Sequence, residues 1–130
     1  MRIVLAPKIG LFAGAALALS SAAALAQAPA REAASPLGPI LADEAGRTLY
    51  VYDRDEPGVS HCYDMCATNW PPFLAATDAR PEGDWTLVQR TDGSAMWAYK
   101  GRPLYYWVND REPGQVTGDG VGGVWHAAMP

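Results

Sequence analysis

The sequence is short of the side chains with which small proteins catalyse reactions or bind nucleic acids. It has only two histidines and two cysteines, and its 10 basic residues are outnumbered by 14 acidic ones. The arginines are scattered singly, so no basic patch indicates a surface for nucleic acid or anionic lipid. No catalytic triad, phosphate-binding loop or closed metal motif occurs at a known spacing. We therefore expect no enzyme activity, no cofactor and no nucleic-acid partner.

Long apolar runs are absent after residue 26, but one precedes it. Arg2 and Lys8 lead into an alanine-rich apolar stretch that ends in Ala24-Leu25-Ala26, the small-x-small pattern of a secretory signal peptide at residues 1–26. A transmembrane anchor is the weaker interpretation, because the stretch is short and ends in a cleavage signal. No cysteine follows it for lipid attachment. We expect an exported protein, periplasmic or extracellular, not lipid-anchored and without a transmembrane segment in the mature chain.

One segment of the chain occurs twice. GRTLYVYDRDEPG, residues 46–58, returns as GRPLYYWVNDREPG, residues 101–114. Each copy contains the motif Tyr-x-aromatic-x-x-Asp. Its members are Tyr50, Tyr52 and Asp55 in the first copy and Tyr105, Trp107 and Asp110 in the second. An internal repeat makes the chain two versions of one supersecondary unit.

The pattern of turn residues predicts an all-β fold. Residues 27–38 are rich in Ala, Pro and small polar residues and predict a flexible leader. From residue 39, short runs of β-forming residues alternate with turns, which predicts strands over 39–43, 48–53, 85–90, 95–100, 103–108 and 124–128. We expect one domain, 39–130, forming a small antiparallel sheet or sandwich. It would contain two hairpin-type repeats, about 39–58 and 95–114, and a short helical turn near the cysteines.

Alternation within the repeats predicts how their strands pack. Tyr50 and Tyr52 face one side of a strand, while Leu49 and Val51 face the other. The second copy has the same alternation, so both faces are apolar in both copies. We expect central strands that are covered on both sides and related by a pseudo-two-fold axis.

The motif allows two interpretations. In the structural one, the aromatic pair builds the core and the Asp accepts hydrogen bonds from loop amides. In the functional one, two aromatic faces converge on a ligand with Asp55 and Asp110, which could also act as an acid/base pair if they lie close together. We favour the structural interpretation, because buried aromatic residues in a small domain need no ligand to explain them.

The two cysteines form the second signal. Cys62 and Cys66 are separated by three residues, so on a helical turn their Cα atoms lie within about 7 Å and can form a disulfide, which we expect in an exported protein. Alternatively, His61, Cys62, Met65 and Cys66 offer soft ligands suited to copper, and free thiols are the third interpretation. His126 could complete such a site if the fold brings it to His61.

A third cluster of potential ligands is acidic. Asp53, Asp55 and Glu56 could hold calcium, but they lack the alternating oxygen ligands and the glycine of a calcium loop. We therefore expect this cluster to be a solvated turn rather than a metal site.

The doubled motif, the export signal and the segment SHCYDMCATNWPPF resemble the secreted-repeat family of predicted bacterial lipoproteins with a Tyr-x-(Phe/Trp/Tyr)-x-x-Asp motif. The resemblance extends from about Pro39 to the C-terminal VWHAAMP, although the lipidation cysteine is missing. It implies an exported envelope protein of unknown function. We expect a non-enzymatic binding or structural module whose partner is an unknown envelope ligand or protein. The alternative is a periplasmic copper-binding or thiol-redox protein that uses His61, Cys62 and Cys66.

Overall fold

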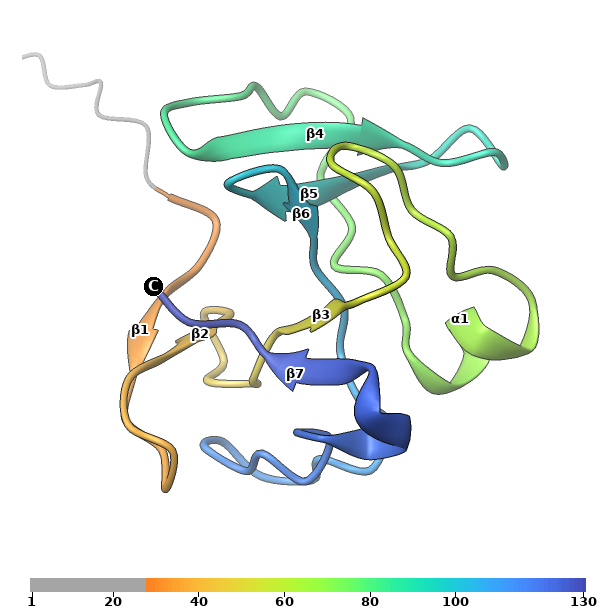
Figure 1. The fold of residues 1–130 in the computed structure, drawn as a ribbon. Helices are drawn as coiled ribbons and strands as arrows, with labels where there is room; N and C mark the ends of the chain where they lie inside the picture. Colours follow the sequence, from red (N-terminus) through yellow and green to blue (C-terminus); the bar gives the residue numbers. More distant parts are fainter. Residues whose placement is uncertain (1–27) are drawn as a thin grey trace, which may run out of the picture.

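The structure is a computed structural model that describes residues 28–130 (Figure 1). The predicted signal peptide, residues 1–26, lies outside the described residues. Within residues 28–130, no helix has the length and apolar character needed to cross a membrane.

The described residues form short strands, as the sequence predicts. They are β1 (Arg31–Ala33), β2 (Ile40–Ala42), β3 (Tyr50–Tyr52), β4 (Trp85–Gln89), β5 (Ala95–Tyr99), β6 (Arg102–Pro103) and β7 (Trp125–Ala127). An α-helix, α1 (Met65–Asn69), follows the first cysteine, and a 3-10 helix, η1 (Val121–Gly123), precedes β7. The strands form three small antiparallel sheets, β1–β2, β3–β7 and β4–β5–β6 (Figure 1). The all-β class and the helical turn near the cysteines are confirmed.

The described part of the predicted flexible leader, residues 28–38, contains regular structure. It contains β1, which pairs with β2 through Arg31 opposite Ala42 and Ala33 opposite Ile40. Ala30 is buried against the core. A three-residue strand of alanine and charged residues has almost no hydrophobic alternation, so composition alone gave no sign of it.

The two motif copies lie side by side and antiparallel. The Tyr50 amide donates to the Tyr105 carbonyl at 2.8 Å, and the Tyr105 amide donates to the Tyr50 carbonyl at 2.9 Å. Other backbone bonds occur in pairs whose members are 55 residues apart in the sequence. In the first pair, the Ala128 amide donates to the Leu49 carbonyl and the Phe73 amide to the Leu104 carbonyl. In the second pair, the Asp53 amide donates to the Val124 carbonyl and the Val108 amide to the Asn69 carbonyl. Such exchange of partners is what a two-fold axis through the Tyr50–Tyr105 pair produces, and it supports the predicted pseudo-symmetry.

The core has two layers, one on each face of the motif strands. Tyr50 and Tyr105 are fully buried in one cluster, which also contains Trp70 and Trp125. Leu49 and Leu104 are fully buried in the other, with Val51, Phe73 and Trp85. The predicted alternation, with both faces covered, is thus confirmed for the central strands.

Candidate functional site

The motif tyrosines and aspartates bond across the two repeats. Tyr50 Oη donates to Asp110 Oδ2 at 2.6 Å, and Tyr105 Oη donates to Asp55 Oδ2 at 2.7 Å. Each tyrosine therefore contacts the carboxylate of the other copy, not of its own. We call these two contacts the reciprocal Tyr–Asp pairs. They account for the presence of Tyr and Asp in both copies, because each copy supplies one half of each pair.

The second oxygen of each carboxylate holds the loop that follows it. Asp55 Oδ1 accepts the His61 amide at 2.7 Å. Asp110 Oδ1 accepts the Thr117 amide at 3.0 Å and the Thr117 hydroxyl at 2.6 Å. These are the bonds to loop amides that the structural interpretation predicts. Because Asp55 and Asp110 accept from separate sets of donors, the contacts do not form the acid/base pair of the functional interpretation.

The middle aromatic residue of each copy lies at one end of a stack of four rings. Tyr52 stacks on Trp125 with centroids 4.2 Å apart, Trp125 on Trp70 at 3.9 Å, and Trp70 on Trp107 at 4.1 Å. The two inner rings are nearly parallel, at 1°. Their sequence positions differ by 55, the offset of the repeat, and this spacing is the signal by which sequence comparison could have found Trp70 and Trp125.

The stack fits tightly against the reciprocal Tyr–Asp pairs. Tyr50 meets Trp70 edge-on at 5.3 Å, and Tyr105 meets Trp125 edge-on at 5.2 Å. The Gly118 amide donates to Tyr50 Oη at 3.1 Å. A Cβ atom at Gly118 would lie 2.7 Å from Trp70 Cη2, so this close approach of the backbone to the ring requires glycine. The hydroxyl of the motif and the ring stack thus form one packed unit.

Burial raises the pKa values of Tyr50, Tyr105 and Asp55. Burial, reinforced by the hydrogen bond to Asp110, raises the pKa of Tyr50 far above its usual value. Burial likewise raises the pKa of Tyr105. Burial also raises the pKa of the Asp55 carboxyl, against the hydrogen bonds from Tyr105 and His61 that lower it. Both tyrosines therefore remain protonated donors, whereas Asp55 is a site where pH acts.

We expect Asp55 to make the protein less stable as pH rises through the acid range. Its pKa in the folded protein lies above the usual 3.8, so protonation favours the folded state. That stabilisation is complete below the unfolded pKa and is lost as pH rises through the folded pKa. Asp55→Asn stays neutral, so its free energy of unfolding relative to wild type should increase from about pH 3 to about pH 6. Urea denaturation across this range measures it, and a decrease would contradict the assignment.

The Cys62–Cys66 segment is tied to the second repeat. The two cysteines form a disulfide, with Cα atoms 5.2 Å apart, and Cys62 is fully buried. Buried Arg90 donates to the Cys62 carbonyl at 2.9 Å and to Ser60 Oγ at 3.0 Å. Ser60 Oγ in turn lies 2.6 Å from Tyr105 Oη. Hydrogen bonds through Arg90, Ser60 and Tyr105 therefore connect the disulfide segment to Asp55.

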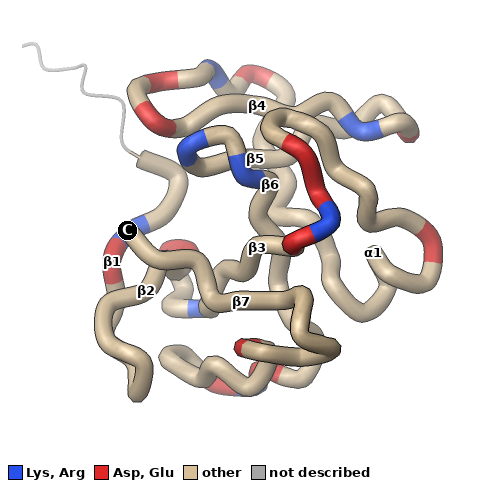
Figure 2. Tube along the Cα trace, viewed as in Figure 1, with Lys and Arg blue, Asp and Glu red and all other residues tan. Residues whose placement is uncertain are grey.

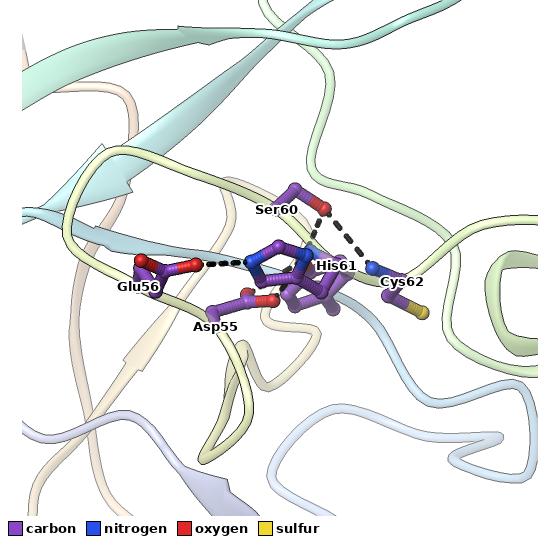
Figure 3. Close-up of polar contacts among 6 residues, drawn as sticks. Asp55, Glu56, Ser60, His61 and Cys62 are labelled. Carbon is purple, nitrogen blue, oxygen red and sulfur yellow. Dashed lines mark hydrogen bonds and ion pairs between the residues drawn. The ribbon is translucent and has the colours of Figure 1, made fainter.

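The predicted copper ligands do not form a common site among the described residues, because most of them make other contacts. Both sulfur atoms are in the disulfide, and His61 Nε2 lies 2.7 Å from Glu56 Oε2, as Figure 3 shows. Met65 is 70% exposed. His126 does not join His61, because its Nε2 lies 2.7 Å from Asp53 Oδ2.

The three acidic residues considered as calcium ligands also contact different partners. Asp53 contacts His126 and Arg102, Asp55 accepts from Tyr105, and Glu56 contacts His61. Within residues 28–130, no cluster of three or more His, Cys, Asp or Glu side chains is arranged to hold a metal ion. The two histidines therefore lie in separate surface pairs, His61 with Glu56 and His126 with Asp53, which are each worth little in stability.

The disulfide has a direct test by mass. We expect the intact protein, isolated without reductant, to be two hydrogen atoms lighter than the reduced chain, with no thiol reacting with an alkylating reagent, because both sulfur atoms are bonded to each other. Mass spectrometry before and after reduction measures this, and Cys62→Ser/Cys66→Ser is the control for background alkylation. Full alkylation of the unreduced protein would contradict the assignment.

Comparison with known proteins adds a family but no activity. A family model described as a secreted repeat of unknown function matches residues 33–73 and 86–129. Each matched range contains one copy of the motif and extends beyond the predicted repeats of about 39–58 and 95–114. No curated protein and no solved structure matches the chain. With two matches that together cover more than half of the sequence, the chain belongs to this family of secreted repeats of unknown function.

Proposed function

We propose that the protein is an exported, non-enzymatic binding module of the bacterial envelope, periplasmic or extracellular and not lipid-anchored. In this proposal the doubled motif builds the framework, and the surfaces that differ between the repeats bind the ligand. The observation that carries it is the pair of reciprocal Tyr–Asp contacts. They engage the polar groups of the motif within the protein.

The polar groups of the motif lie largely out of reach of a substrate. A general acid, base or nucleophile has to come within hydrogen-bonding distance of the reacting atom. Tyr50 and Tyr105 are fully buried, and Asp110 is 7% exposed. Each carboxylate already accepts hydrogen bonds on both of its oxygens. This arrangement gives no support to the functional interpretation, in which Asp55 and Asp110 contact a ligand, and it favours a framework role for the motif.

The copper-binding or thiol-redox alternative is favoured by no specific contact. Metal binding by cysteine needs the thiolate, and here both sulfur atoms are bonded to each other. His61 is paired with Glu56 on the surface. Thiol–disulfide exchange depends on access to the sulfur atoms, and Cys62 is fully buried.

Two measurements on the full chain test the proposal. Cells expressing it are fractionated, and the mature protein is expected in the soluble periplasmic or external fraction, beginning near Gln27. The labelled mature protein is then titrated by NMR with soluble fragments of cell-wall and capsular polymers, which are recovered and weighed by mass spectrometry. We expect the NMR signals of amides outside the motif loops to shift. We expect mass spectrometry to find the polymer fragments chemically unchanged. Conversion of a probe, or shifts centred on the His61 and Thr117 amides, would overturn the proposal.

A further inference from the structure

The hairpin of β4 and β5 carries three aromatic side chains that the pseudo-two-fold does not repeat. They are Trp85, Trp97 and Tyr99. The strand registers place Ala30, Leu41 and Asp43 at the corresponding positions of the first repeat. The framework is thus built in one repeat without these rings. Aromatic residues that the symmetry does not require are candidates for a role in binding.

These rings line a cavity. Trp85, Trp97 and Tyr99 border a pocket of about 360 Å³, a size typical of sites for small ligands. Trp85 contacts both other rings, edge-on to Trp97 at 6.3 Å and tilted against Tyr99 at 4.8 Å. The segment Ala28–Pro29 forms another wall. Figure 1 shows the first described residues near the start of β4.

Three charged side chains surround the rings. Arg80, Glu82 and Asp84 line the same pocket, on the loop that leads into β4. All three are exposed, and within residues 28–130 their side chains form no ion pair or hydrogen bond. Figure 2 shows both signs of charge along this loop. Unlike the carboxylates of the motif, these groups are therefore available to a ligand.

We propose that this pocket binds a neutral sugar. The inference rests on the proposed function and names its ligand class. A pyranose ring has apolar C–H faces, which pack on aromatic rings, and a rim of hydroxyl groups, which both donate and accept hydrogen bonds. Glu82 and Asp84 can accept from those hydroxyls, and Arg80 can donate to them. The pocket offers both kinds of contact within one cavity.

The charges around the pocket argue against other ligand classes. Arg80 lines the pocket and Lys100 Nζ lies 5.2 Å from the centroid of Tyr99, so two positive charges face the two negative charges of Glu82 and Asp84. The charges of the two signs balance, and the pocket therefore favours neither a cation nor an anion. A purely apolar ligand would displace water from the parts of the three charged groups that line the pocket and would offer them no hydrogen bond in return. A neutral ligand rich in hydroxyl groups meets none of these objections.

The test is a titration of the 15N-labelled mature protein with soluble oligomers of N-acetylglucosamine and, separately, of glucose. We expect at least one series to shift the Trp85 and Trp97 indole signals saturably in the millimolar range or below. Trp97→Ala should weaken this binding about tenfold or more, because it removes a central aromatic contact. Glu82→Gln/Asp84→Asn lies on the surface and keeps the fold, and it should weaken binding about fivefold by replacing charged acceptors with neutral ones.

Matched controls separate the site from general effects. Glu112→Gln changes an exposed carboxylate outside the pocket and should leave the affinity unchanged. Tetramethylammonium is titrated as the cationic probe and a short-chain fatty acid as an anionic probe with an apolar chain, and neither should shift the pocket signals.

The outcomes distinguish this inference from the proposed function. If neither sugar series shifts the indole signals, or if the carboxylate variant binds as tightly as wild type, the sugar site is wrong. If tetramethylammonium or the fatty acid saturates the pocket instead, the ligand class is wrong while a binding module remains. If a sugar is cleaved or otherwise converted, the non-enzymatic function itself is overturned.

Discussion

Asp110→Asn is expected to lower the free energy of unfolding by about 2–4 kcal/mol, and Asp55→Asn by about 1 kcal/mol. Asp110 is buried and accepts three hydrogen bonds, from Tyr50 Oη, Thr117 N and Thr117 Oγ1. An amide has a single acceptor oxygen, so its NH₂ group faces at least one of these donors. Tyr50 Oη has the Gly118 amide as its other neighbour, which is also a donor. The Tyr50 proton therefore loses its acceptor inside the core.

Asp55→Asn is expected to cost less because Asp55 is more exposed and its tyrosine has a second polar neighbour. It is only partly buried and accepts two hydrogen bonds. Tyr105 Oη also lies 2.6 Å from Ser60 Oγ, which can accept its proton when the carboxylate is gone. Urea denaturation at neutral pH, followed by circular dichroism, compares the two variants, with Glu112→Gln as the exposed control. Equal losses, or a larger loss at Asp55, would show that the described difference between the two pairs is wrong.

Trp70→Ala and Trp125→Ala are each expected to lower the free energy of unfolding by about 3–5 kcal/mol. Both side chains are almost fully buried at the centre of the four-ring stack, and each also contacts a motif tyrosine edge-on. Removing one ring leaves a cavity beside the other, so the second substitution should cost less in the first variant than in wild type. Trp107→Ala, at the partly exposed end of the stack, should cost less than either.

Calorimetry and near-ultraviolet circular dichroism measure this prediction. The total free energy of unfolding of a domain of this size is about 5–15 kcal/mol. A loss of about 3–5 kcal/mol is therefore large enough to unfold an alanine variant at room temperature when the total lies at the low end of that range. Trp70→Phe and Trp125→Phe then provide folded comparisons, since phenylalanine retains part of the stacked ring. If Trp107→Ala proved as damaging as Trp70→Ala, the inner rings would not be the centre of the core.

The sequence predicted those parts of the fold that depend on local pattern. Alternation of aromatic and aliphatic residues indicated central strands covered on both sides, and the strands predicted over 85–90 and 95–100 are present as β4 and β5. The strand β1 was missed because alanine and charged residues give no such alternation. The predicted strand over 103–108 is reduced to β6 and two isolated bridges at Tyr105, to Tyr50 and to Pro72, since this segment changes partners from β5 to β3.

The site was harder to predict because its contacts join distant residues. The spacing of Tyr50 and Asp55 says nothing about which tyrosine faces which carboxylate, and the exchange between copies depends on the two-fold arrangement. Trp70 and Trp125 share the repeat offset, but Trp-Pro-Pro and Trp-His-Ala look unlike each other in sequence. The pocket beside Trp85 needed the structure as well, because Arg80, Glu82 and Asp84 are ordinary loop residues until the hairpin places rings beside them.

These observations divide the molecule into two kinds of feature. Features repeated by the pseudo-two-fold, such as the reciprocal Tyr–Asp pairs and the ring stack, hold the two repeats together. Features present in one repeat only are the Cys62–Cys66 segment and the aromatic pocket of β4 and β5. In our proposal the first kind serves folding and the second kind binds the ligand. The framework role of the motif is thus the central claim.

A pair of double-mutant cycles tests that claim most directly. The first combines Tyr50→Phe with Asp110→Asn, which are bonded across the repeats, and the second combines Tyr50→Phe with Asp55→Asn, which belong to the same motif copy. We predict a coupling energy of about 1–2 kcal/mol in the first cycle and a value within about 0.5 kcal/mol of zero in the second. Strong coupling within one copy and none between the copies would contradict the reciprocal arrangement.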